Sequence, residues 1–332
     1  MRGWLPALSG AAAVLVAACE GGNIDAGRDI PHGMLPVDDR NAVIIANDSV
    51  TDNWTGEYAM LMANSGGGPL VGIIVNSSRY WQDLAANAAA WDQLVEAARA
   101  SGLRNIPSAT ASAGDPLVRP ADGEIDHTTP NMSAGAKLIV EQSARWGPPW
   151  RPLVVATGSR LTDVADAYLI DHSVVDRVVV VSALGGPDDN VPGTVMGWPN
   201  GELDAWAGWI VGQRFRYVQV NGYYEQRGDV TTAQVPDLPA NPFGDWMAAK
   251  LPTLYQIAMS SDQISVLAVG LPPFVTAFSR AAVDTSVAYD LAPGSALMPR
   301  ADGPVWLVPS CDSAMAVDRL WKMLVDPRTF GR

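Results

Sequence analysis

The stretch of sequence that decides the fold reads LVVATGSRLTDVA and spans residues 153–165. Its first residues, Leu153–Ala156, form an uninterrupted apolar run, which is typical of a strand buried on both faces. A polar turn that contains a glycine follows at Thr157–Ser159, and a helical pattern then runs from Leu161 to Ile170. A strand, a short turn and a helix in direct succession make up most of a βαβ unit, so this stretch predicts an α/β fold.

The same alternation of apolar runs and helical patterns extends to both sides of this stretch. Apolar runs predict further strands at residues 42–46, 70–75 and 177–181. Helical patterns predict helices at residues 84–100, at 134–144 with Ser133 as the N-cap, and at 206–211. Right-handed crossovers between such strands place them side by side, so we predict a doubly wound, mostly parallel sheet with a Rossmann-like core.

Length and composition exclude several classes of protein. The chain has 332 residues, and its hydrophobic content of 48% is too high for a disordered chain. The formal net charge is −13 and no basic cluster occurs, which argues against DNA or RNA as a partner. No apolar run reaches the ~18 residues that a membrane-spanning helix needs. We therefore expect one acidic α/β domain over residues 41–332.

The first nineteen residues have the pattern of an export signal. Arg2 supplies a positive charge, Leu5–Ala18 is apolar but too short to span a bilayer, and small residues precede Cys19. This pattern resembles a bacterial lipobox, which implies a signal peptide over residues 1–18 and a lipid on Cys19 that anchors the protein to a membrane of the cell envelope. Residues 19–40 then form a flexible tether. The alternative is an ordinary signal peptide that contains a chance cysteine.

Polar or glycine-rich turns follow four of the predicted strands, at residues 47–53, 76–78, 157–159 and 182–186. Ligands of open parallel sheets bind at the carboxyl ends of the strands, so we expect these turns to converge on one site. Their carboxylate, carboxamide and hydroxyl oxygens suit a hard cation such as Ca²⁺ and the vicinal hydroxyls of a sugar. The sequence contains neither the Cys/His cluster of a zinc site nor a glycine-rich phosphate loop with a lysine. Each turn taken alone is also compatible with a simple helix cap.

Several motifs that recur in order resemble the inosine-uridine nucleoside hydrolase superfamily. They are GIIVN at residues 72–76, DPLVRP at 115–120, LVVATGSRLTDVA at 153–165 and VDRVVVVSALGG at 175–186. The resemblance runs from about Ala42 to Asp204 and resumes near Asp284. It implies hydrolysis of the N-glycosidic bond of a nucleoside or related ribosyl substrate. In that family a calcium ion holds the ribose diol and a water molecule, and an aspartate takes the proton of the water.

The resemblance also implies a role for individual residues. Asp52 matches the general base, and Asp48 matches an aspartate that binds both metal and sugar. The remaining matches are Asn53, the backbone carbonyl of Thr157 and Asp284 for the metal, and Asn76 and Asn200 for the sugar. Trp198 flanks the expected pocket, where its ring suits stacking on a base or sugar. For Asp284 the alternative is a cap of a helix toward Tyr289.

The sequence departs from the family pattern at several of these positions. The leading aspartate of the family's first motif falls on Ala46, and a neighbouring metal aspartate is replaced by Asn53, which removes charge that a Ca²⁺ site needs. A histidine that often precedes the distal aspartate falls on Val283, so one route for protonating the leaving base is missing. The extra residues before Tyr58 leave the register open, and Glu57 is an alternative metal ligand.

Two hypotheses from different classes remain. The first is a calcium-assisted N-ribohydrolase or related glycosidase at the cell envelope. The second is a non-catalytic lipoprotein that binds a sugar or nucleoside on the same fold, with a partly eroded metal site. Both have a small-molecule ligand and a membrane as partners, and both leave open whether the chain forms a homo-oligomer.

Overall fold

The computed structural model describes residues 37–51, 54–78, 81–112, 115–183, 204–220, 232–251, 274–286 and 297–331. The predicted signal peptide and Cys19 lie outside these residues. Val37, the first described residue, is buried in the core, so the packed part of the chain already includes residues that we predicted to belong to the tether.

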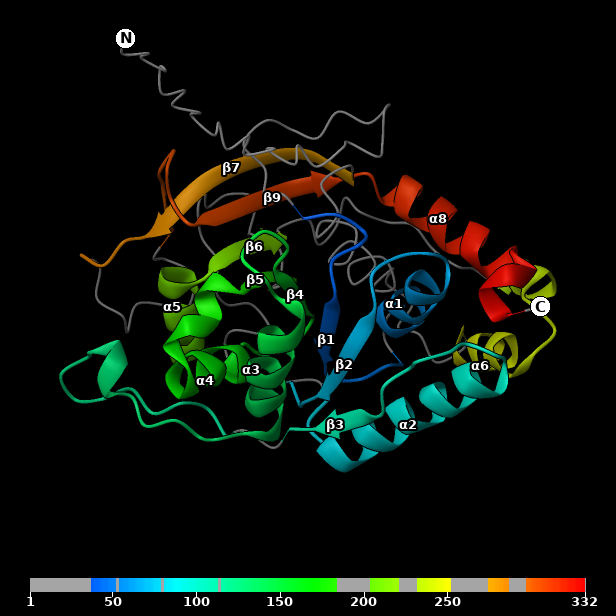
Figure 1. Cartoon of the computed structure of the whole chain (residues 1–332), viewed down its shortest axis with the longest axis horizontal. Helices are drawn as coiled ribbons and strands as arrows, with labels where there is room; N and C mark the ends of the chain where they lie inside the picture. Colours follow the sequence, from blue (N-terminus) through cyan, green and yellow to red (C-terminus); the bar gives the residue numbers. More distant parts are fainter. Residues whose placement is uncertain are drawn as a thin grey trace, which may run out of the picture.

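The described strands form one nine-stranded sheet in the order β3-β2-β1-β4-β5-β6-β9-β7-β8. All neighbouring strands are parallel, except that β7 runs antiparallel to both β9 and β8 (Figure 1). The predicted doubly wound, mostly parallel α/β fold is confirmed. The strands are β1 Val43–Asn47, β2 Leu70–Val75, β3 Ala109–Ala111, β4 Leu153–Thr157, β5 Val178–Ala183, β6 Arg216–Val220, β7 Val275–Val283, β8 Leu297–Pro299 and β9 Val305–Cys311.

The described helices lie in two layers, one on each face of the sheet (Figure 1). One layer packs its apolar side chains into a core with alternate strand residues such as Ile45 and Val154, and the other packs against the opposite set, such as Ile44 and Val155. The first layer contains α1 Thr55–Asn64, α2 Leu84–Ala100, α6 Pro242–Lys250 and α8 Ser313–Val325; the second contains α3 Ala134–Trp146, α4 Thr162–Ile170 and α5 Ala205–Arg214. Short 3₁₀ helices cover Ile125–His127, His172–Asp176, Thr232–Asp237 and Pro327–Phe330.

Several helices begin where the sequence places capping residues, whereas α1 and α4 begin without a side-chain cap. The Ser133 side chain accepts a hydrogen bond from the backbone N–H of Ala136, and the Asp204 side chain accepts one from Ala207. The predicted helix at residues 84–100 is confirmed without change as α2. In the part of the chain that the structure describes, no helix combines the length and the apolar character that crossing a membrane requires.

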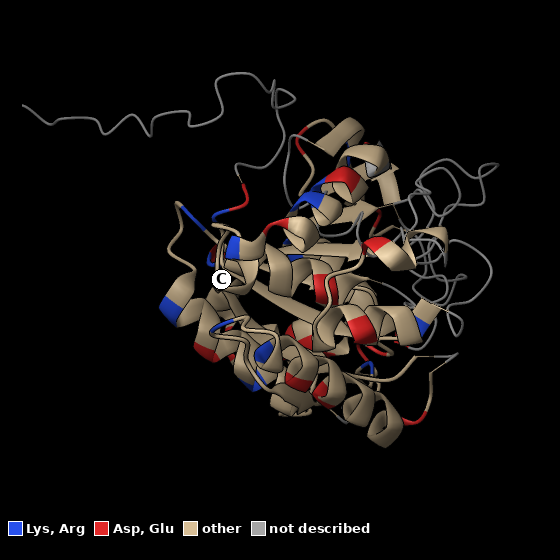
Figure 2. Ribbon diagram, turned by 90° about the vertical axis from the view of Figure 1, so that its right-hand side faces the viewer, with Lys and Arg blue, Asp and Glu red and all other residues tan. Residues whose placement is uncertain are grey.

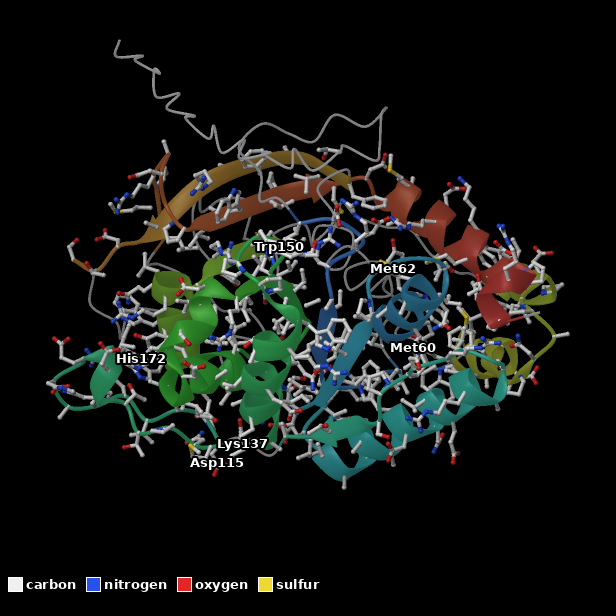
Figure 3. The ribbon with its side chains drawn as sticks, viewed as in Figure 1. Met60, Met62, Asp115, Lys137, Trp150 and His172 are labelled. Atoms are coloured by element: carbon white, nitrogen blue, oxygen red, sulfur yellow. The ribbon has the colours of Figure 1, made fainter. Side chains whose placement is uncertain are left out.

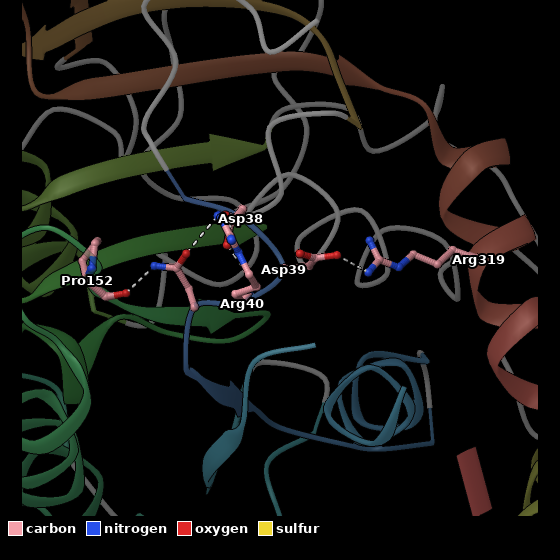
Figure 4. Close-up of polar contacts among 6 residues, drawn as sticks. Asp38, Asp39, Arg40, Pro152 and Arg319 are labelled. Carbon is pink, nitrogen blue, oxygen red and sulfur yellow. Dashed lines mark hydrogen bonds and ion pairs between the residues drawn. The ribbon is translucent and has the colours of Figure 1, made fainter. Parts of the chain in front are cut away.

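Polar contacts fix residues 38–41, which lead into β1, at the amino edge of the sheet, where the parallel strands begin (Figure 4). The Asn41 side chain donates to the carbonyl of Pro152 at 2.7 Å, just before β4, and accepts from the backbone N–H of Asp38 at 2.9 Å. The guanidinium of Arg319 in α8 bonds the carboxylate of Asp39 at 2.6 Å. The entry to β1 is therefore held by both its neighbouring strand and a distant helix.

Helix α1 is buried along most of its length, because the sheet lies on one side of it and α2 and α8 pack on others. Met60 and Met62 are both buried there (Figure 3). A Cβ atom added at Gly56 would lie 2.6 Å from Cζ3 of Trp91 and 2.8 Å from Cδ2 of Leu94. Only glycine thus allows α1 and α2 to approach this closely.

We expect Gly56→Ala to lower the free energy of unfolding by about 1–3 kcal/mol, because the rigid indole of Trp91 has no room to move in a filled core. Helix propensity alone predicts the opposite sign, a gain of up to about 1 kcal/mol. Urea unfolding of the variant and the wild type measures the difference. A variant as stable as the wild type would show that the two helices can move apart at no cost.

Candidate functional site

The turns after β1, β2 and β4 meet at the carboxyl edge of the sheet. The backbone N–H of Asn76 donates to the carbonyl of Asn47 at 2.9 Å, and that of Gly158 donates to the carbonyl of Ala46 at 3.0 Å. These bonds continue the parallel register beyond the strand ends. The structure therefore brings Asp48, Asn76 and Thr157 to one edge of the sheet, as the sequence pattern predicts.

Asp48 is buried in a turn that local hydrogen bonds shape. Its Oδ1 accepts from the backbone N–H of Ser49 at 2.7 Å, and its own N–H donates to Oδ1 of Asn47 at 2.9 Å. The indole Nε1 of Trp91 in α2 donates to the backbone carbonyl of Asp48 at 3.0 Å. A helix of the adjoining layer thus sets the position of the first acidic turn.

Asn76 is also buried, and both ends of its carboxamide have partners. Nδ2 donates to Oδ2 of Asp163 at 3.0 Å, and Oδ1 accepts from Oγ of Ser159 at 2.6 Å. Its backbone carbonyl accepts from Nδ2 of Asn87 in α2 at 3.1 Å. These contacts use one donor and one acceptor position of the carboxamide and fix its orientation.

Thr157, the last residue of β4, is fully buried. Its side-chain hydroxyl donates to the backbone carbonyl of Ser159 at 3.2 Å, so the polar turn after β4 closes on itself. The backbone of Thr157 lies beside Ala46 of β1 and Ser182 of β5 in the sheet. Its carbonyl is the group that the resemblance assigns to the metal.

Asp284 does not join this group, which corrects the sequence-based assignment. Strand β7 runs antiparallel to β9. Val275 of β7 lies opposite Cys311, which is the last residue of β9, and Ala281 lies opposite Val305, which is the first residue of β9. Because β9 runs parallel to β6 and the strands beyond it, β7 ends at the amino edge of the sheet. Asp284 follows β7 there and is partly exposed, and hydrogen bonds from the side chain and backbone of Ser286 lower the pKa of its carboxyl.

Glu57, the alternative metal ligand, is instead engaged in a buried ion pair. Its Oε1 accepts from Nζ of Lys250 at 2.9 Å and from Nε1 of Trp246 at 3.0 Å. Nζ of Lys250 also lies 4.3 Å from the centre of the Trp54 ring, within the range of a cation–π contact. An ammonium group of this chain, supplied from α6, thus already compensates the Glu57 charge.

The other predicted site residues, Asp52, Asn53, Trp198 and Asn200, lie outside the described residues. Among the residues that are described, no group of three or more His, Cys, Asp or Glu side chains is placed to hold a metal ion. Figure 2 shows that basic residues (Lys and Arg) and acidic residues (Asp and Glu) both occur on several helices and loops of the described chain.

Two further carboxyl groups, which the sequence motifs did not indicate as site residues, are buried near this edge. Asp163 accepts from the Ser112 and Ser133 hydroxyls and from Asn76, and Asp204 accepts from Thr162 and two backbone N–H groups. Burial raises the pKa of both carboxyls, although these donors oppose the shift. The sequence does contain a signal for Asp163. It is the aspartate of the LTDVA motif, one residue after the helix start, on a helix with few other polar residues.

We expect Lys250→Met to lower the free energy of unfolding by about 3–5 kcal/mol, because it leaves the Glu57 carboxylate buried without its cation. The double variant Glu57→Gln with Lys250→Met is the matched control and should recover most of the loss, since no net charge then remains buried. Urea unfolding measures both. A single variant that costs less than about 1 kcal/mol would show that water reaches Glu57.

No protein-family model matches the sequence, and no curated protein matches it. Solved structures do match. A plant nucleoside hydrolase is 15% identical with a TM-score of 0.60, and the match covers 87% of this chain and 100% of that one. An inosine-guanosine nucleoside hydrolase is 15% identical with a TM-score of 0.61, over 86% of this chain and 98% of that one. The inosine-uridine preferring nucleoside hydrolase of Bacillus anthracis is 13% identical with a TM-score of 0.59, over 86% and 99%. The chain therefore has the fold of the nucleoside hydrolases, as the sequence motifs predicted.

Proposed function

We propose that the protein is a calcium-assisted hydrolase of N-glycosidic bonds that acts on a nucleoside or a related ribosyl compound at the cell envelope. The observation that carries the proposal is the convergence of Asp48, Asn76 and Thr157 at the carboxyl edge of a sheet whose fold is that of solved nucleoside hydrolases. A buried carboxylate, a fixed carboxamide and a backbone carbonyl are groups that can bind a sugar and a hard cation.

The oxygen donors at this edge fit calcium, which takes six to eight oxygen ligands, better than they fit a metal that prefers nitrogen or sulfur. Asp48 and the Thr157 carbonyl would hold the ion together with Asn53, water and the sugar diol. Bound calcium would polarise a water molecule and orient the two hydroxyls. Asp52 would accept a proton from the water as the water oxygen bonds to the anomeric carbon and the C–N bond breaks, and the departing base would take up a proton from solvent. Asn76 and Asn200 bind the sugar hydroxyls, and Trp198 stacks on the base or sugar.

Asp284 has no part in this proposed calcium site, because it follows β7 at the amino edge of the sheet, opposite to the edge that carries Asp48.

The second candidate function is a non-catalytic lipoprotein that binds a sugar or nucleoside at the same edge. Two observations favour it over catalysis. The first is that Glu57, an alternative metal ligand, is paired with Lys250. The second is that Asp284 lies at the amino edge of the sheet, whereas Asp48 lies at the carboxyl edge. Asn76 and an aromatic wall suffice for such a protein, whereas hydrolysis also requires Asp52 and a bound cation.

Calcium binding and hydrolysis separate the two functions. With saturating Ca²⁺, the wild type should release base from a nucleoside, and Asp52→Asn should lower kcat by ~10²–10⁴-fold while ribose binding persists, because only the proton acceptor is lost. Calorimetric titration should show weaker Ca²⁺ binding for Asp48→Asn. Asp284→Asn is the control and should bind Ca²⁺ like the wild type. Ribose binding without release of base from any nucleoside would favour the binding protein.

The proposed membrane anchor is tested independently of the site. Cys19→Ala should release the protein from membranes or block its maturation, because the thiol is the group that receives the lipid. Fractionation of cells after a high-salt wash, followed by mass determination of the mature N-terminus, measures the effect. A Cys19→Ala variant that stays with the membrane fraction would contradict lipidation and leave the proposed hydrolysis unaffected.

A further inference from the structure

Five chain segments meet around the carboxamide of Asn76. They are the ends of β2 and β3, the turn after β4, and the first turns of α3 and α4. We propose that Asp163, in the first turn of α4, is a positioning residue that fixes the carboxamide of Asn76 in the one orientation that serves the sugar. This inference rests on the proposed sugar site and adds a residue to it.

The orientation follows from the chemistry of the contacts. Three groups that can donate, the Ser112 and Ser133 hydroxyls and the Asn76 amide, face the Asp163 carboxyl, an arrangement that suits a carboxylate that only accepts. The Asn76 atom at 3.0 Å from Oδ2 of Asp163 is then the amide Nδ2. Oδ1 of Asn76 then faces Oγ of Ser159 at 2.6 Å, and this hydroxyl donates. A hydroxyl alone does not select an orientation, because it can donate or accept. Asp163 therefore makes the selection.

Asp163 is itself held in place from three sides. Its Oδ1 accepts from Oγ of Ser112 at 2.6 Å and from Oγ of Ser133, the N-cap of α3, at 2.8 Å. A Cβ added at Gly135 would lie 2.7 Å from Cγ of Asp163, so α3 closes directly over the carboxyl group. The backbone N–H of Gly135 also donates to Oγ of Ser112 at 3.1 Å. Hydrogen bonds to both carboxylate oxygens and the close approach of α3 thus hold the Asp163 side chain in place.

A purely structural role does not need a charge at this position. Asp163 is 2% exposed, burial raises the pKa of its carboxyl, and the nearby Asp166 carboxylate adds repulsion. An asparagine has the same shape and avoids this desolvation, and the Ser112 and Ser133 hydroxyls can turn to accept from it. What an asparagine cannot do is force Nδ2 of Asn76 toward it, because either end of its amide can face Asn76. The charge is thus explained by the orientation of Asn76.

The test is Asp163→Asn, with Asp166→Asn as the matched control. Asp166 is an equally buried carboxylate in the same helix, but it accepts hydrogen bonds from the backbone N–H groups of Met132 and Ser133. Calorimetric titration with ribose in the presence of Ca²⁺ measures affinity, and urea unfolding measures stability. We expect Asp163→Asn to weaken ribose binding by ~10-fold, the value of one well-placed hydrogen bond, with a urea midpoint at or above that of the wild type. Asp166→Asn should bind ribose like the wild type.

A second variant separates orientation from stability. Asp163→Asn combined with Asn76→Asp reverses the donor and acceptor of the pair, so the contact reforms and the urea midpoint should stay near that of the wild type. Ribose affinity should remain low, because residue 76 then offers only acceptors. Equal ribose affinity for Asp163→Asn and the wild type, or no binding of ribose by the wild type, would overturn the proposal. Ribose binding with the expected variant pattern but no hydrolysis would overturn only the proposed enzyme activity.

Discussion

The burial of both sheet faces constrains everything else in this structure. Strands β1, β2, β4 and β5 are apolar on both sides because one helical layer covers each face. Within such strands a polar side chain would lose its water without gaining a partner, so polar groups accumulate at the last strand residue and just beyond it. Parallel strands end at the same edge, and this places Asp48, Asn76 and Thr157 together. The position of the candidate site is therefore a consequence of the packing of the core.

Several polar groups at this edge are nevertheless buried, and two of them have well-defined partners. The Asn76 carboxamide lies between Asp163 and Ser159, and the Glu57 carboxylate bonds Lys250 and Trp246. Isolated carboxylates in a core are unfavourable, so these contacts stabilise the fold only while every partner is present. Such networks also restrict side chains to one geometry, which a binding site for a small sugar requires.

Much of the fold could be predicted from the sequence, because uninterrupted apolar runs and capped helices have local signatures. Strand β2 and helix α2 occupy the predicted residues without change. Strand β6 was missed, since the polar residues Arg216 and Gln219 interrupt the apolar run of RYVQV, although Gln219 is fully buried. Asp284 was misplaced because a motif does not reveal the direction of its strand: β7 is antiparallel, and this reverses the edge at which its last residue lies. The Glu57–Lys250 pair joins residues 193 positions apart, a separation that no local pattern reports.

The central claim is that ligands bind at the carboxyl edge of the sheet. Hydrogen exchange of the protein followed by mass spectrometry, with and without ribose and Ca²⁺ together, tests this claim directly. Binding should slow exchange in peptides that cover residues 47–51, 76–78 and 157–159. Exchange at residues 147–152 and 284–286, at the amino edge, should not change. Protection confined to the amino edge, or no protection at the three turns in the presence of both ligands, would contradict the account.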